Sequence, residues 1–171
     1  MPDDSIMVGD PNGAVSKHPP VSTVEDVITF RLQRLVTIGD RAGNQWFERL
    51  FDLTLNEWRL LALIVAHAPA RAGDMADLLY MDKSQLSRVI KSLQSKGLIR
   101  NATDPNDGRA VALKPTGKGK KLYTTILEEV LRSNERVLAP LTAEEVAVFD
   151  SLLGKLIDHN SALLEARLAN K

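Results

Sequence analysis

Apolar residues recur along most of the chain three and four positions apart, which is the spacing of helices that bury one face. The pattern predicts a long first helix over residues 24–50. The capping box Thr54-Leu55-Asn56-Glu57 opens a second helix to about His67, which Pro69 ends. A short third helix is predicted over residues 73–79. The first half of the chain is therefore predicted to be helical.

Residues 83–96 form the most regular of the predicted helices. Asp82 is a favourable N-cap residue, and Gly97 supplies the left-handed position that commonly ends a helix. One apolar stripe runs along the helix, at Leu86, Val89, Ile90 and Leu93. The stripe predicts one buried face, and the other face is basic and hydroxyl-rich.

Two short extended segments follow, over residues 98–102 and 109–114, around a turn rich in Pro, Asn, Asp and Gly. This pattern predicts a two-stranded hairpin. A long helix then runs to about Leu138, and the capping box Thr142-Ala143-Glu144-Glu145 opens a last helix to near Ala169. The predicted fold class is mainly α, with one small β hairpin.

The 22 basic and 22 acidic residues give a net charge of zero, but they are distributed unevenly along the chain. Residues 54–121 contain 12 basic and 6 acidic side chains, whereas residues 1–53 and 122–171 each contain 5 basic and 8 acidic ones. A basic centre between acidic flanks is typical of a surface that contacts phosphates.

Several classes of protein are disfavoured by composition. The chain has no cysteine, only three histidines and no catalytic or metal-ligand motif at recognisable spacing, so we expect no enzyme, metal site or cofactor. No apolar run approaches the ~20 residues that span a bilayer, so we expect no membrane contact and a cytoplasmic location. Residues 1–22 have the composition of a disordered tail.

Four motifs then occur in series. They are LTLNEW at residues 53–58, DKSQLSRVIKSLQSKGLI at 82–99, DPNDGRA at 104–110 and LKPTGKG at 113–119. In this order and spacing they resemble the MarR (multiple antibiotic resistance regulator) family. The resemblance implies a mainly α, winged helix-turn-helix fold with a two-stranded β wing and long N- and C-terminal dimerisation helices.

The resemblance also implies a domain organisation. Residues 1–22 would be the tail, 23–52 a first dimerisation helix, 53–115 the winged helix-turn-helix domain and 116–171 the C-terminal dimerisation helices. A homodimer would place two recognition helices about 34 Å apart on a pseudo-palindromic duplex operator. Packing of the C-terminal helices within one chain is the alternative.

Residues 83–96 are the recognition helix under this interpretation. We assign base readout mainly to Ser84, Gln85, Ser87 and Arg88, and phosphate contacts to Lys83, Lys91 and Lys96. The alternative for the same residues is a charged helix face that contacts only solvent.

The wing carries a second predicted contact. In the family, the Asp of the turn orients the Arg, which reaches the minor groove or its flanking phosphates, and the matching residues are Asp107 and Arg109. A plain surface ion pair is the alternative. Two departures from the family pattern are Gly108, which removes one wing charge, and Arg71, which leaves the third helix without a Ser or Thr cap.

Family members are typically repressors released by a small aromatic or anionic effector that binds beside the first helix. Candidate effector-binding residues near that position are Arg34, Gly39, Arg41, Gly43, Trp46 and Trp58. The glycines either leave room for a ligand or let a neighbouring helix approach closely. A helical protein-interaction module, an activator and a regulator without any effector remain open as alternatives.

Overall fold

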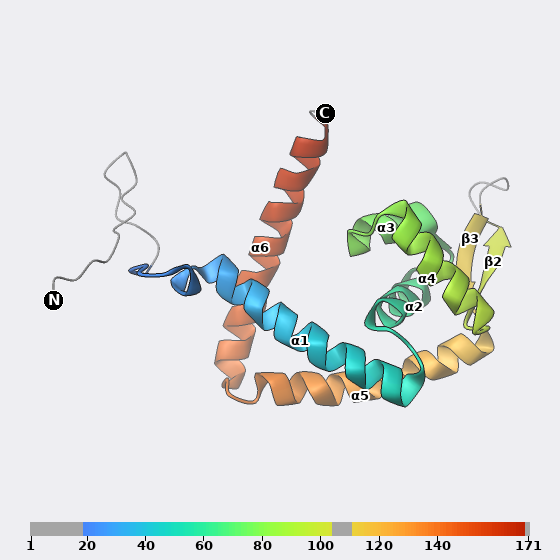
Figure 1. The fold of residues 1–171 in the computed structure, drawn as a ribbon, viewed down its shortest axis with the longest axis horizontal. Helices are drawn as coiled ribbons and strands as arrows, with labels where there is room; N and C mark the ends of the chain where they lie inside the picture. Colours follow the sequence, from blue (N-terminus) through green and yellow to red (C-terminus); the bar gives the residue numbers. More distant parts are fainter. Residues whose placement is uncertain (1–18, 104–110, 170–171) are drawn as a thin grey trace. The chain divides into compact units, whose positions relative to one another are not determined.

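The computed structural model describes residues 19–103 and 111–169 (Figure 1). In chain order the elements are η1 (Val24–Asp26), α1 (Ile28–Phe51), α2 (Leu55–His67), β1 (Ala70–Arg71), α3 (Ala72–Leu79), α4 (Lys83–Ser95), β2 (Ile99–Thr103), β3 (Val111–Pro115), α5 (Gly117–Leu138) and α6 (Ala143–Ala169). Most of the predicted tail, together with Asp107 and Arg109 of the wing, lies outside the described residues.

The chain forms two compact units, one up to Tyr123 and one from Thr124 onward. Helix α5 passes from the first unit into the second, so the boundary lies inside this helix, whereas the sequence placed the end of the winged domain at residue 115. The first turns of α5 belong to the N-terminal unit because they contact the end of α4, as described below.

The first predicted helix is divided in two. The Asp26 carboxylate accepts hydrogen bonds from the backbone N–H groups of Ser22 and Thr23, at 3.0 and 2.9 Å, and these bonds close the short 3₁₀ turn η1. Val27 then takes an extended conformation, and α1 begins at Ile28. Hydrophobic spacing continues across Val27, so periodicity alone predicted one uninterrupted helix.

Helix α2 is the centre of the N-terminal unit. Its predicted capping box is confirmed: the Glu57 N–H donates to Thr54 Oγ1 at 3.2 Å, and the Thr54 N–H donates to Glu57 Oε2 at 2.6 Å. Leu60, Leu61 and Ile64 are completely buried, so α2 supplies the core against which the other helices of this unit pack.

Helices α3 and α4 form the predicted helix-turn-helix. Tyr80 adopts a left-handed conformation that ends α3, and Asp82 caps α4 by accepting a hydrogen bond from the Gln85 N–H at 2.7 Å. Gly97 has the expected positive φ of 70° beyond the end of α4. As predicted, Arg71 provides no side-chain cap for α3.

The wing belongs to a three-stranded antiparallel sheet in the order β1-β3-β2. The predicted hairpin pairs Ile99 with Pro115 and Thr103 with Val111. Strand β1 was not predicted, because its two residues, Ala70 and Arg71, are too few to show any periodicity. They pair with Leu113 and Ala112 of β3, so β3 is held on both sides.

The C-terminal unit contains the end of α5 and all of α6. The predicted capping box at the start of α6 is confirmed by hydrogen bonds between Thr142 and Glu145 of 2.8 and 3.2 Å. Large apolar side chains remain exposed along α6, including Val148, Leu152, Leu156, Ile157 and Leu163. Within the described part of the chain, no helix is long and apolar enough to cross a membrane.

Candidate nucleic-acid interface

Helix α4 presents two faces of different chemistry. Leu86 and Leu93 are buried, and Val89 and Ile90 are half-buried, as the apolar stripe predicted. The predicted DNA-contacting side chains of the other face are all exposed: Lys83, Ser84, Gln85, Ser87, Arg88 and Lys91. This face carries three cations, and residues 83–95 contain no acidic residue. It can therefore donate hydrogen bonds and attract phosphate along its whole length.

The N-terminal end of α4 is fixed by its cap. The hydrogen bond from the Gln85 backbone N–H is the main cause that lowers the pKa of Asp82, and hydrogen bonds from Ser84 and the charge of Arg88 act in the same direction. Asp82 is consequently ionised at neutral pH and complements the positive end of the helix dipole. The first turn of α4 is thus ordered, and Lys83, Ser84 and Gln85 project from it into solvent.

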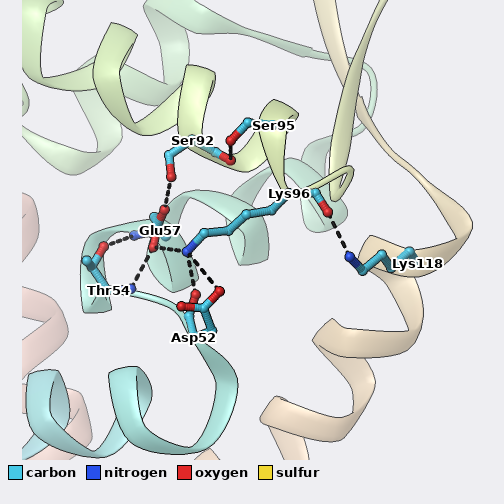
Figure 2. A network of polar contacts seen from close by, with 7 residues as sticks. All are labelled: Asp52, Thr54, Glu57, Ser92, Ser95, Lys96 and Lys118. Atoms are coloured by element: carbon cyan, nitrogen blue, oxygen red, sulfur yellow. Dashed lines mark hydrogen bonds and ion pairs between the residues drawn. The ribbon is translucent and has the colours of Figure 1, made fainter.

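The C-terminal end of α4 is fixed by a buried carboxylate (Figure 2). Glu57 is only 4% exposed, and its Oε1 accepts a hydrogen bond from the hydroxyl of Ser92. Its Oε2 lies 3.2 Å from the ammonium of Lys96, which also donates to the backbone carbonyl of Asp52. We call Glu57, Ser92 and Lys96 the α2–α4 lock.

The lock gives Lys96 a role inside the protein, beside the phosphate contact that the sequence predicts. Its side chain is 28% exposed, and its ammonium is directed to Glu57 and to the end of α1 (Figure 2). The sequence did not reveal this role, because Glu57 already had a local explanation as part of a capping box. The residues of the lock are 35 and 39 positions apart in the chain, beyond the reach of any local pattern.

The hydrogen bonds of the lock also decide the charge of Glu57. Burial is the largest effect and raises the pKa of this carboxyl, but hydrogen bonds from Ser92, the Thr54 backbone and Lys96 together bring it below the ordinary value of 4.5. Glu57 is therefore ionised at neutral pH. Its contribution to stability is present above about pH 4.5 and is lost as the pH falls through the lowered pKa.

The chain beyond α4 is held by the start of α5. The Thr116 hydroxyl donates to the Gly97 carbonyl at 2.7 Å, and the Lys118 ammonium donates to the Lys96 carbonyl at 2.8 Å. Gly119 lies so close to this segment that a Cβ atom would be 2.0 Å from the carbonyl oxygen of Leu98. The sequence showed these residues only as part of a family motif, without their contacts.

The base of the wing is joined to the same helix. The Gln94 side-chain amide donates to the Asn101 side chain of β2 at 2.7 Å. Strand β2 leads toward the predicted Asp107 and Arg109 contact, which lies outside the described residues. The base of the wing is therefore joined directly to the recognition helix by a side-chain hydrogen bond within the N-terminal unit.

The predicted effector-binding residues occupy different environments. Trp58 is buried and stacks on Phe47 and Tyr123, with ring centroids 5.8 and 5.7 Å away. Trp46 meets the edge of Phe47 at 4.8 Å. A Cβ atom on Gly43 would lie 3.5 Å from a methyl group of Leu55, an ordinary packing distance.

The remaining effector candidates are on the surface of α1. Arg34, Gly39 and Arg41 are exposed, and a Cβ atom on Gly39 would meet nothing within 4 Å. Next to them, Asp40 forms an ion pair of 2.6 Å with Arg59 of α2, a contact that the sequence did not suggest. A Cβ atom at Gly43 would therefore fit against Leu55, and Gly39 lies beside open space.

Comparisons with known proteins agree on one family. The MarR family model matches residues 51–110, which include α2, α3, α4 and β2. A relative from Bacillus subtilis, the uncharacterised HTH-type transcriptional regulator YybA, is 30% identical over 117 residues, covering 68% of this chain and 77% of the relative.

Solved structures share the fold. A SlyA-like transcription regulator from Listeria monocytogenes is 26% identical with a TM-score of 0.72, covering 80% of this chain and 90% of the other. The MepR–DNA complex from S. aureus shares the fold at 20% identity, with a TM-score of 0.70 and coverage of 80% and 99%. Family members regulate transcription and are not enzymes. The protein is therefore a DNA-binding transcriptional regulator that belongs to the MarR family.

Proposed function

We propose that the protein is a cytoplasmic homodimeric repressor that binds a pseudo-palindromic operator through two copies of α4. The observation that carries this proposal is the exposed face of α4, which has three cations and several hydrogen-bonding side chains on a helix fixed at both ends. Ser84, Gln85, Ser87 and Arg88 read base edges in the major groove. Lys83 and Lys91 contact phosphates, and Asp107 with Arg109 extends the contact to the minor groove.

The exposed apolar side chains of α1 and α6 support the proposed dimerisation. Leu35, Val36 and Ile38 of α1 are exposed, as are the apolar side chains of α6 named above. A soluble monomer seldom leaves so many large apolar residues in contact with water. A second copy of the chain is the partner that removes them from water and creates the two-fold symmetry of a palindromic site.

The test of this proposal is the selection of bound fragments from the protein's own genome, followed by footprinting. We expect a protected duplex with two related half-sites about one helical turn apart, and sedimentation of the free protein as a dimer. The half-sites mirror the two-fold axis of the dimer. A monomer at micromolar concentration, or protection of one unpaired half-site, would contradict the proposal.

Replacing Arg88 by Ala should relax base preference at one position of each half-site. A bidentate contact between Arg88 and guanine contributes about 1–3 kcal/mol of discrimination, and its loss affects the preferred sequence most. Binding to a set of operators with single base changes measures this preference. Lys91→Ala is the matched control on the same helix and should weaken all sequences about equally. Parental base preference in Arg88→Ala would place this side chain away from the bases.

We also propose an effector of small aromatic or anionic character that binds beside α1, where Gly39 faces open space and Arg34 and Arg41 are exposed. Such a ligand releases DNA if it prefers the DNA-incompetent state, and a tenfold loss of affinity requires about 1.4 kcal/mol of preference. A screen of aromatic acids and their thioesters against the protein–operator complex tests this proposal, with Gly39→Leu as the variant that fills the space. Release by a metal ion or peroxide alone would contradict it.

A further inference from the structure

The α2–α4 lock has no place in the contacts proposed with DNA. Glu57 is buried and negatively charged, so it does not touch a phosphate or a base. It is the one buried charged side chain in the part of the chain that the structure describes. Its Oε1 accepts a hydrogen bond from Ser92 of α4, and its Oε2 is shared by the Thr54 N–H at the start of α2 and the ammonium of Lys96 at the end of α4 (Figure 2).

The lock holds α4 at two points. Ser92 and Lys96 are four residues apart, one helical turn, and both bind the same carboxylate. Lys96 also donates to the carbonyl of Asp52, the left-handed residue that ends α1. Two attachments one turn apart restrict both the rotation of α4 about its axis and its position along α2.

Small rotations matter at the exposed face of α4. Side-chain tips lie about 6 Å from the axis of a helix, so a rotation of about 20° moves them by about 2 Å. A displacement of this size breaks a hydrogen bond to a base edge, because such bonds need separations near 3 Å. Contacts to phosphates by flexible lysines tolerate it far better. Loss of the lock should therefore affect recognition of sequence more than attraction to DNA.

We propose that Glu57 and Lys96 are positioning residues for operator recognition, and that they fix the rotation of α4 relative to α2 and the end of α1. Stability alone gives little reason for this arrangement, because apolar residues of similar volume often stabilise a buried position as well as an ion pair does. What the charged pair adds is a defined geometry. This inference rests on the proposed function, in which α4 reads the operator.

Replacing Glu57 by Gln separates a positioning role from a purely electrostatic one, because the two predict opposite changes in operator affinity. Removing a negative charge should tighten binding to any polyanion, whereas losing the lock should weaken operator binding. We expect operator affinity to fall about tenfold, the order of one mismatched base pair, with affinity for a random duplex within about twofold of the parent. The two dissociation constants are measured by titration of labelled duplexes.

Lys96→Met separates positioning from a direct phosphate contact. If Lys96 is a positioning residue, operator affinity falls about tenfold, and the dependence of log K on log salt keeps its slope. If it touches a phosphate, the slope decreases by about 0.9 for each copy, and both duplexes lose affinity equally. Lys91→Met is the matched control, and it should show the reduced salt slope and the equal loss of affinity for both duplexes. Lys96→Arg preserves the charge and should recover most of the operator affinity.

The outcomes are distinct. Parental or tighter operator binding by folded Glu57→Gln overturns the inference, as does a reduced salt slope in Lys96→Met. If thermal unfolding shows that Glu57→Gln is not folded, Ser92→Ala replaces it, since it removes one hydrogen bond to the same carboxylate without changing any charge. A threefold or larger loss of operator affinity then supports the inference, and parental affinity overturns it. A parent protein that does not prefer its operator to a random duplex overturns the proposed function, and the inference with it.

Discussion

Raising the salt concentration from about 50 to about 200 mM should weaken operator binding by about a thousandfold. The cations expected on the DNA are Lys83 and Lys91 at phosphates and Arg109 in the minor groove or at its flanking phosphates, in each copy. A dimer therefore neutralises the charge of about six phosphates and releases their counterions. The resulting slope of log K against log salt is about −5. The net charge of the whole chain is zero, so this dependence has to arise from the basic centre of the protein.

Fluorescence anisotropy of a labelled operator at several salt concentrations and constant pH measures the slope. Lys91→Met should reduce its magnitude by about 2, because one contact is lost from each copy. Arg132→Met is the control in the C-terminal unit, where Arg132 forms an ion pair with Glu129, and it should leave the slope unchanged. A slope near zero for the parent would contradict the phosphate contacts proposed for Lys83 and Lys91.

Replacing Gly119 by Ala should destabilise the protein by about 3 kcal/mol, at the upper end of the usual cost of overpacking. The added Cβ atom would lie 2.0 Å from the carbonyl oxygen of Leu98 and 3.0 Å from its carbonyl carbon. These are backbone atoms at the start of the wing, so no flexible side chain can move aside. The first turn of α5 would have to separate from the segment that follows α4.

The matched control is Gly117→Ala in the same turn of α5, where a Cβ atom meets nothing within 4 Å. Alanine is the better helix former by up to about 1 kcal/mol, so this variant should be as stable as the parent or slightly more stable. Urea unfolding of both variants without DNA measures the difference. Equal midpoints for Gly119→Ala and the parent would show that α5 does not approach Leu98 this closely.

The sequence predicted the elements whose signals are local. Helices α2 and α4 begin at their caps, Thr54 and Asp82, and Gly97 has its left-handed conformation beyond α4. The wing strands are within two residues of their predicted limits. Each of these features depends on residues that are only a few positions apart, so a pattern in the chain is enough to reveal it.

Features that depend on distant partners were not predictable. Strand β1 exists because β3 pairs with it, and Glu57 has its second role because Ser92 and Lys96 fold against it. The candidate site also contains both locally determined features and features that depend on distant partners. The exposure of the polar face of α4 followed from its period, but the enclosure of Trp58 between Phe47 and Tyr123 required the tertiary structure.

Strand β3 has a consequence for how such regulators diversify. Because β1 pairs with one edge of β3 and β2 with the other, the register of the sheet is set outside the connection between Thr103 and Val111. Insertions or deletions in that connection change how far the wing reaches and leave the support of the recognition helix in place. Evolution can therefore change the length of this connection without altering the register of the three strands that support it.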